Sequence, residues 1–409
     1  NFTTGQQASI SNTNAKVSWT ATDGSSSGTT YLNLDNAMVE VKNSTAFYFS
    51  YELEWWWSAS SVDINSYTPG TNGTATLDIN PGVALEYMIQ LSNILQASPW
   101  ICVPHLANDA YVHNLGQLVA TTLNSTLNAT FEYSNELWNT QFAQSQFADK
   151  MADVENITKA QWIAKRSAQI FAILDSEFQA VGASSRLIKV VGSQAAGSSW
   201  SEELLAAFNS STYNPSQVKV QALAIAPYFG NAIGDQFVTE GIEDTATTDD
   251  VIDACRPAIR FNSYQWMLDS KAVANKYGVT MVAYEGGQHL VGTYGNVDND
   301  ALTTLLTSSN RSPRMQGQYD EMFRLWSESG GDLFQVFSFV GDYSKWGSWG
   351  ILETQNQNTS TAPKYGSVSR YAQYYKAGYV PSNGPTTSPH ASGSPESGDV
   401  SEATQTVVS

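Results

Sequence analysis

The feature that most constrains this chain is an alternation that begins near residue 83 and continues to about residue 340. Short apolar runs alternate there with amphipathic segments of ten or more residues. Such alternation is typical of βα units and predicts a parallel sheet. The expected helices are Val83–Leu95, Asp109–Leu123, Lys159–Val181, Ser201–Phe208, Val251–Tyr277 and Met315–Ser329. The expected strands are Trp100–Pro104, Thr130–Tyr133, Leu187–Gly192, Ala222–Ala226, Thr280–Tyr284 and Leu333–Phe339.

The length of 409 residues suits one (β/α)8 TIM barrel with additional segments. Ala46–Leu53 gives a seventh strand, so a closed barrel needs one more from residues 1–45. That segment is rich in Ser, Thr and Asn, and its short alternating stretches predict β-structure and loops without a clear helix. We expect an atypical β-rich segment (1–45) that would complete the barrel, a glycosidase-like barrel (46–379) and a low-complexity tail (380–409).

The tail, Val380–Ser409, contains Pro, Gly, Ser and Thr with almost no large apolar side chains. Such a segment cannot bury enough surface to offset its chain entropy. We expect a disordered linker or stalk that could carry O-linked glycans.

Two acidic residues follow apolar strands in the barrel region. Glu136 comes after the expected fourth strand, in Phe131-Glu132-Tyr133-Ser134-Asn135-Glu136-Leu137-Trp138-Asn139. Glu285 comes after the seventh, in Met281-Val282-Ala283-Tyr284-Glu285-Gly286-Gly287-Gln288-His289. The carboxyl ends of barrel strands are where catalytic groups lie. Glycoside hydrolysis needs two carboxyl groups, and a separation of about 5 Å is typical of a retaining enzyme.

These motifs resemble clan A of the glycoside hydrolases, the retaining (β/α)8 enzymes that include many β-glucanases, cellulases and mannanases. More closely, residues 82–375 look like bacterial secreted proteins described as cellulose-binding or cellulase-like. The segments that carry this resemblance are Gly82–Met88, Pro99-Trp100 with Pro104-His105-Leu106, Glu132–Glu136, Ala224–Gly230, Ala283–His289 and Tyr343–Gly350.

The resemblance implies a role for several residues. Glu136 would be the acid/base and Glu285 the nucleophile of a double displacement, which needs no cofactor. The resemblance also implies that Asn135 binds the sugar 2-hydroxyl, that Tyr228 donates to Glu285, and that His105 lines the mouth. The expected sugar-binding residues are Asn135, His105, Tyr228, Trp138, Trp346, Trp349 and Trp56, the last as one member of Trp55-Trp56-Trp57.

Plainer roles remain open for the same residues. Glu136 could be a helix N-terminal carboxylate stabilised by the helix dipole. Glu285 could be a structural hydrogen-bond acceptor, and Tyr228 could serve packing alone. His105 and His289 could be satisfied core histidines, and the scattered histidines do not suggest a metal site.

One departure from the family keeps a second class of function open. Clan A enzymes usually carry an Arg at the end of strand two, whereas Phe49–Trp57 contains neither Arg nor Lys. The alternative is a non-catalytic structural or adhesive glycoprotein that uses the barrel as a scaffold or lectin and could self-assemble.

Composition points to an extracellular or cell-surface protein with a polysaccharide or oligosaccharide partner. The net charge of −18 disfavours nucleic acid, and no apolar run approaches the 18 residues of a membrane span. Cys102 and Cys255 could form a disulfide or remain buried thiols. Besides Asn1, the N-glycosylation sequons are Asn43, Asn72, Asn124, Asn128, Asn156, Asn209, Asn310 and Asn358, which favours a secreted glycoprotein.

Overall fold

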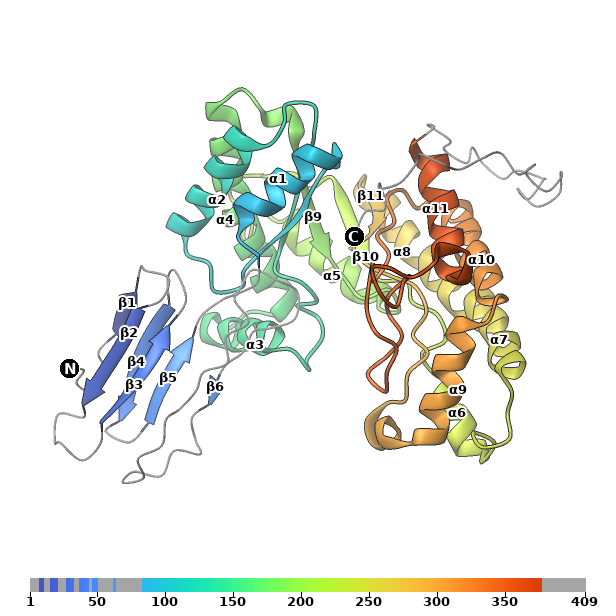
Figure 1. The fold of residues 1–409 in the computed structure, drawn as a ribbon. Coiled ribbons are helices and arrows are strands. Elements are labelled where there is room, and N and C mark those ends of the chain that lie inside the picture. Colours follow the sequence, from blue (N-terminus) through green and yellow to red (C-terminus); the bar gives the residue numbers. More distant parts are fainter. Residues whose placement is uncertain are drawn as a thin grey trace. The chain divides into compact units, whose positions relative to one another are not determined.

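The computed structural model describes the backbone of residues 83–376, the side chains of residues 83–374, and the backbone of the strands between residues 7 and 63. The chain divides into two compact units, and each is described by itself. Unit 1 comprises Asn1–Ile94, Ser98–Trp162 and Ile170–Leu187. Unit 2 comprises Leu95–Ala97, Ile163–Gln169 and Ile188–Ser409. Figure 1 labels the elements of both.

The N-terminal strands are antiparallel. β1 (Gln7–Ile10), β4 (Ala37–Asn43), β5 (Ala46–Ser50) and β6 (Val62–Asp63) form one sheet, in the order β1-β4-β5-β6. β2 (Ala15–Thr20) pairs with β3 (Ser27–Leu32). These strands agree with the β-structure that the sequence predicts for residues 1–45.

The expectation that Ala46–Leu53 forms a parallel barrel strand is wrong. Its first part, β5, is antiparallel to both β4 and β6. Only two residues, Ser44 and Thr45, separate β4 from β5. A connection this short joins antiparallel strands, because a parallel crossover needs a dozen residues or more.

In unit 1, β7 (Trp100–Val103) lies parallel to β8 (Ala129–Tyr133), with Val103 opposite Tyr133. Every residue of β8 is buried, as expected for a strand of a parallel sheet that is covered on both faces. Phe131 of β8 packs edge-on against Phe178, with ring centroids 6.0 Å apart. The helices are α1 (Leu85–Leu95), α2 (Asp109–Thr122), α3 (Ala143–Glu155) and α4 (Lys159–Ala180).

The helices of unit 1 begin where capping residues allow. The Asn108 side chain accepts a hydrogen bond from the Tyr111 amide and caps α2. Thr158 and Gln161 form a reciprocal capping box at the start of α4. A short 3-10 turn, Ser184–Arg186, then leads into β9 (Leu187–Gly192).

In unit 2, β9 and β10 (Ala222–Ile225) are parallel, and β10 is parallel to β11 (Thr280–Ala283). Leu333–Phe339, expected as a strand, runs beside β11 with a parallel bridge between Ala283 and Phe334. The helices are α5 (Ser198–Phe208), α6 (Ile233–Glu240), α7 (Thr248–Pro257), α8 (Tyr264–Tyr277), α9 (Asp300–Arg311), α10 (Met315–Glu328) and α11 (Pro363–Lys376).

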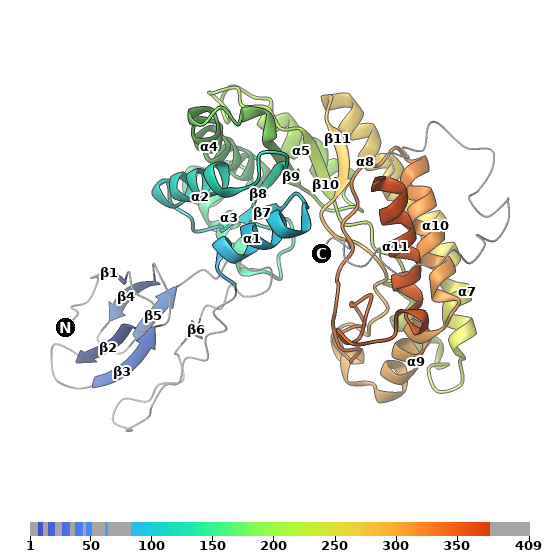
Figure 2. The same cartoon turned by 45° about the horizontal axis from the view of Figure 1, so that its top comes forward.

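The single helix expected over Val251–Tyr277 is interrupted by a π-helical segment, Ala258–Ser263. It begins directly after Pro257, whose ring and missing N–H disturb the regular α-helical ladder. α10 and α11 lie side by side in both views (Figures 1 and 2). The described part of the chain is thus a parallel α/β structure preceded by antiparallel strands.

Burial settles the state of one cysteine. Cys255 on α7 is a free and fully buried thiol, and burial raises its pKa to about 12. Cys102 on β7 lies 3.9 Å from Glu132 Oε2. Among the described helices, none has the length and apolar character needed to cross a membrane.

Candidate functional site

Glu285 lies at the carboxyl end of β11 in unit 2. It follows the strand by two residues and is only 6% exposed. The two glycines after it make the turn possible. A Cβ on Gly286 would lie 2.6 Å from Phe334 Cζ. Gly287 has a φ of +144°, and a Cβ there would lie 2.9 Å from the Tyr319 hydroxyl, so other residues would strain this turn.

Tyr228 is placed beside Glu285 by the pairing of neighbouring strands. Ile225, the last residue of β10, is opposite Ala283, and the pairing continues past the strands as a bridge between Phe229 and Gln288. The Tyr228 hydroxyl donates to Glu285 Oε1 at 2.9 Å, the contact that the sequence predicted. A neutral donor to a carboxylate favours its ionised form.

An aromatic cluster adjoins this pair. The Trp349 ring is edge-on to Tyr228, His289 and Phe337, with centroids 5.9, 5.1 and 5.8 Å away. Tyr228 and His289 also contact each other at 5.5 Å. The tyrosine that donates to the buried carboxylate therefore lies in an aromatic cluster formed by His289, Trp349 and Phe337.

His289 differs from the satisfied core histidine that the sequence left open. Its Nδ1 is buried and has no hydrogen-bond partner. Burial lowers the pKa of the His289 imidazole, which favours the neutral ring. A buried polar atom without a partner is costly, so Nδ1 is available to a ligand hydroxyl.

The segment Tyr343–Gly350 carries Trp346 and Trp349. Ser344 and Gly347 exchange backbone hydrogen bonds, and the Trp349 indole donates to Trp346 O at 2.8 Å. Gly347 has a φ of +117°, and a Cβ there would lie 2.3 Å from Trp349 Cε2. The position of Trp349 therefore depends on Gly347. Trp349 itself is half-buried, whereas Trp346 is 68% exposed.

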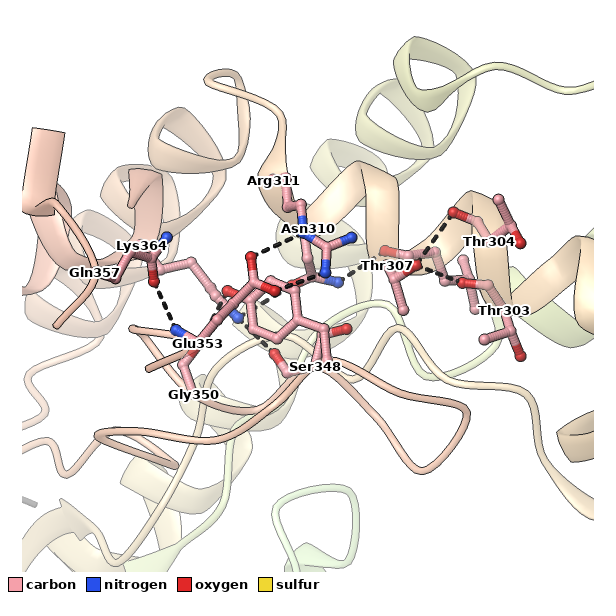
Figure 3. A network of polar contacts seen from close by, with 12 residues as sticks. Thr303, Thr304, Thr307, Asn310, Arg311, Ser348, Gly350, Glu353, Gln357 and Lys364 are labelled. Carbon is pink, nitrogen blue, oxygen red and sulfur yellow. Dashed lines mark hydrogen bonds and ion pairs between the residues drawn. The ribbon is translucent and has the colours of Figure 1, made fainter. Parts of the chain in front are cut away.

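A buried lysine anchors this segment, as Figure 3 shows. Lys364 on α11 is fully buried, and its Nζ donates to Ser348 O at 2.5 Å and to Asn310 Oδ1 at 3.2 Å. The same ammonium lies 4.3 Å from the centroid of the Tyr343 ring. Burial holds the pKa of Lys364 well below its usual value.

An ion pair between Arg311 and Glu353 completes the network in Figure 3. Arg311 binds both carboxylate oxygens of Glu353, at 2.8 and 2.6 Å, and its guanidinium lies over the Tyr343 ring. Gln288 donates to Ser348 O at 2.8 Å from the other side. The segment that carries the tryptophans is thus fixed to α9, α11 and the turn after β11.

Glu136 lies in unit 1, three residues after the end of β8. Its φ is +49°, and that of Ser134 is +56°, which is uncommon for residues other than glycine. The Asn139 side chain donates to Glu136 Oε2 at 3.0 Å, and the Asn139 amide donates to Glu136 O at 2.9 Å. α3 begins only at Ala143, so Glu136 is not the helix N-terminal carboxylate of the alternative interpretation.

The other described residues predicted on this side are half-buried: Asn135 and Trp138 flank Glu136 in the sequence, and His105 follows β7. The Asn135 carbonyl accepts from the Gln144 side chain at 3.0 Å. His105 packs edge-on against Phe147 at 5.3 Å, and its carbonyl accepts from the Tyr133 hydroxyl at 2.9 Å. Trp138 is half-buried as well. Trp56 lies outside the described residues.

Glu132, which the sequence did not single out, is a second acidic residue of this strand. It is 2% exposed and accepts from the Trp100 indole at 3.0 Å. One sequence signal sets Glu132 apart: it lies inside the strand β8, where both faces of the strand are buried, and not after the end of the strand. Glu132 therefore belongs to the interior of unit 1 and not to the strand end.

The sequons fall into two groups. Asn128, Asn156, Asn209 and Asn358 are exposed, and Asn124 is half-buried. Asn310 is fully buried, and its Nδ2 donates to Leu306 O at 3.0 Å while its Oδ1 accepts from Lys364. The expectation of a glycan at Asn310 is therefore incompatible with the folded chain. Asn43 and Asn72 lie outside the described side chains.

Glu136 belongs to unit 1 and Glu285 to unit 2. Among the described residues, no group of three or more His, Cys, Asp or Glu side chains is arranged to hold a metal ion.

No family model matches the sequence, and no curated protein does. Among solved structures, the chain is similar to glycoside hydrolases, the group that its motifs resemble. A GH51 arabinofuranosidase from Xanthomonas axonopodis pv. citri is 13% identical, with a TM-score of 0.41, over 63% of this chain and 49% of that one. A 4-O-α-L-rhamnosyl-β-D-glucuronidase from Fusarium oxysporum is 12% identical, with a TM-score of 0.41, over 69% and 52%.

An endo-β-1,4-mannanase from Thermotoga petrophila is 13% identical, with a TM-score of 0.40, over 73% of this chain and 62% of that one. The chain thus spans about half the length of the first two structures. At these values, the function has to be argued from the residues of the chain itself.

Proposed function

We propose that this chain is a secreted retaining glycoside hydrolase of a β-linked polysaccharide, such as a β-glucan, built on a (β/α)8 barrel. Glu285 attacks the anomeric carbon, and Glu136 protonates the leaving oxygen and later activates water. The observation that carries the proposal is the hydrogen bond from Tyr228 to the buried Glu285 at the carboxyl end of β11.

The surroundings of Glu285 fit a nucleophile. A nucleophilic carboxylate must be ionised at rest, and the Tyr228 hydroxyl favours the charged form. The Trp349, His289 and Phe337 rings keep its neighbourhood apolar and supply a wall for a sugar ring. His289 Nδ1 adds a polar atom that a sugar hydroxyl can satisfy.

The surroundings of Glu136 fit an acid/base. It is half-buried at the end of β8, and the Asn139 amide fixes one of its oxygens while the carboxyl group stays near the surface. Its left-handed backbone aims the side chain at a cost of about 1–3 kcal/mol, which is the kind of strain that functional sites retain. A retaining mechanism requires its two carboxyl groups to stand about 5 Å apart.

Azide rescue of two alanine variants tests the proposal on a panel of aryl β-glycosides. Glu285→Ala should lose hydrolysis of every substrate and form an α-glycosyl azide when azide is added, because the anion replaces the nucleophile. Glu136→Ala should hydrolyse substrates with poor leaving groups about 10²–10⁴-fold more slowly and substrates with good leaving groups at a much less reduced rate. With azide it should form a β-glycosyl azide.

The exposed Glu86 on α1 provides the matched control, since Glu86→Ala should keep full activity with unchanged folding. Hydrolysis that survives in both test variants would refute the two-carboxylate mechanism. Release of the opposite anomer by the wild type would refute retention.

One observation favours the alternative of a structural or adhesive glycoprotein. The region that carries the strand-two Arg in clan A enzymes begins here in β5, which belongs to an antiparallel sheet. The scaffold alternative predicts no hydrolysis of any sugar by the folded wild-type chain, with glycan binding retained in Glu136→Gln and Glu285→Gln. Sedimentation of the full chain would show whether it also self-assembles.

A further inference from the structure

The short 3-10 segment Tyr294–Asp298 in unit 2 presents one aromatic ring to solvent. Tyr294 is 92% exposed, the largest value among the exposed large apolar and aromatic side chains of the described residues. Its φ of +49° is unusual for an aromatic residue. Solvent gives such a ring no packing energy, so the ring stays open to a ligand.

The segment is held firmly although its ring is exposed. Asp235 on α6 accepts hydrogen bonds from the Thr293 amide at 3.2 Å, from the Thr293 hydroxyl, and from Asn296 Nδ2 at 2.7 Å. Burial opposes ionisation of Asp235, but the hydrogen bonds from Asn296 and Thr293 outweigh it and lower its pKa. Asn299 is tied to Glu243 at 3.3 Å. Tyr294 is therefore presented by a preorganised support.

An ion pair joins this segment to a second exposed ring. Lys345 Nζ donates to Asp298 Oδ1 at 2.6 Å and lies 4.9 Å from the centroid of the Trp346 ring. Trp346 is 68% exposed. The ammonium covers one part of the indole and leaves the remainder to solvent.

A series of contacts links the Trp346 segment to the surroundings of Glu285. Trp346 O accepts from the Trp349 indole, and the Trp349 ring contacts Tyr228, which donates to Glu285. All of these residues belong to unit 2. A series of direct contacts therefore connects the candidate nucleophile with the exposed rings.

We propose that Tyr294 and Trp346 form an outer carbohydrate-binding platform that holds sugar units of a polysaccharide beyond the unit bound at Glu285. The proposal rests on the proposed function and adds to it that extended chains are the preferred ligands. A ring plane can stack on the apolar face of a pyranose. The polar groups of the same segment and its ion pair, Asn296, Asp298 and Lys345, can bind its hydroxyls, whereas a protein partner would call for a continuous apolar patch.

Binding of soluble β-glucan, mannan and galactan by the full chain tests the platform. Affinity electrophoresis in the Glu285→Gln background measures binding without hydrolysis. Tyr294→Ala and Trp346→Ala should each weaken binding of the recognised polysaccharide about 3–10-fold, and the double variant should weaken it further. Tyr294→Phe should restore binding because it keeps the ring.

Phe261→Ala is the matched control, because Phe261 is 76% exposed on the π-helical segment and makes none of these contacts. Equal binding by the double variant and by the Phe261→Ala variant would overturn the platform. If the chain proves to hydrolyse no sugar, reduced polysaccharide binding by both alanine variants still supports the platform, so the failures of the two proposals can be told apart.

Hydrolysis provides a second readout in the active background. The ratio of kcat/KM for the polysaccharide to kcat/KM for an aryl glycoside should fall in Tyr294→Ala. A ratio unchanged from wild type would overturn the platform, since an outer subsite acts only on long substrates.

Discussion

The two candidate carboxylates are held in different ways. Glu285 is buried, accepts a hydrogen bond from a tyrosine, and adjoins a cluster of aromatic rings supported by α9 and α11. Glu136 is half-buried in a loop with two left-handed residues, and one asparagine fixes its carboxylate.

The difference matches the different demands of the two proposed roles. A nucleophile keeps one charge state and benefits from a rigid, apolar surrounding that favours attack. An acid/base must exchange protons with its surroundings in both halves of the reaction, which a half-buried loop position permits. The comparison therefore predicts that substitutions of residues that hold Glu285 in place will lower stability or activity strongly, whereas those around Glu136 will have mild effects.

The largest effect is expected for Gly347→Ala. The new methyl group would overlap the Trp349 ring, and the φ of +117° would be strained, so unfolding should become easier by about 2–4 kcal/mol. Urea denaturation measures the change. Gly317→Ala on α10, where a Cβ meets nothing within 4 Å, should leave stability equal or raise it. Equal stability of the two variants would contradict the role of Gly347.

Removal of the Tyr228 hydroxyl should come next. Tyr228→Phe keeps the ring contacts with His289 and Trp349 but loses a hydrogen bond to a charged group, worth about 1.5–3 kcal/mol. We expect kcat/KM on aryl glycosides to fall about 10–100-fold. Tyr87→Phe, at an exposed position on α1, serves as control. Unchanged kinetics would remove Tyr228 from the mechanism.

Lys364 should make the free energy of unfolding depend on pH in the range below 10.5. Its pKa is lowered by burial in the folded chain, so in the window below 10.5 the unfolded chain binds the extra proton. The free energy of unfolding of wild type relative to Lys364→Met should therefore rise with pH, by up to about 1.4 kcal/mol per pH unit, and level off above 10.5.

Denaturation at a series of pH values measures this difference. The same series with Lys150→Met, which changes an exposed lysine in unit 1, should give no such trend. A wild-type advantage that stays constant up to pH 10.5 would show that Lys364 is charged in the fold.

The smallest effect is expected for Asn139→Ala. Loss of its hydrogen bond to Glu136 should cost about 0.5–1.5 kcal/mol, seen as a drop of a few-fold in kcat/KM on substrates with poor leaving groups. Asn356→Ala, at an exposed position, is the control. A loss as large as that of Tyr228→Phe would break the comparison between the two carboxylates.

The sequence predicted the parallel strands well because each is a short, mostly apolar segment between amphipathic ones. β9 has the predicted limits, and β11 ends one residue earlier than predicted. The helix α3 was missed because its many polar and small residues weaken the apolar stripe. The helix α9 was also missed, although Leu302, Leu305 and Leu306 lie at helical spacing on its buried side. The strand β5 was found, but its antiparallel pairing depends on the short connection after β4.

The candidate site could be predicted only where local sequence carries the signal. An acidic residue shortly after an expected strand pointed to Glu136 and Glu285, and the family resemblance implied that Tyr228 donates to Glu285. Lys364 gave no such signal, because its burial depends on Tyr343 and Ser348, which only the fold brings to it. Tyr294 was missed because its exposure is also a property of the folded chain.

Asn310 lies in an N-glycosylation sequon but is buried in the fold, so folding would depend on whether the cell that produces the chain attaches glycans to asparagine. Oligosaccharide transfer acts on an asparagine before it is enclosed, whereas the native packing of Asn310 against Lys364 forms only when α9 and α11 meet. A chain that acquires the sugar first cannot make that contact, and a chain that closes first can no longer acquire it. Glycosylation before folding and folding before glycosylation would give two populations of molecules with the same sequence. Only the unglycosylated molecules would keep the contacts that support Trp349.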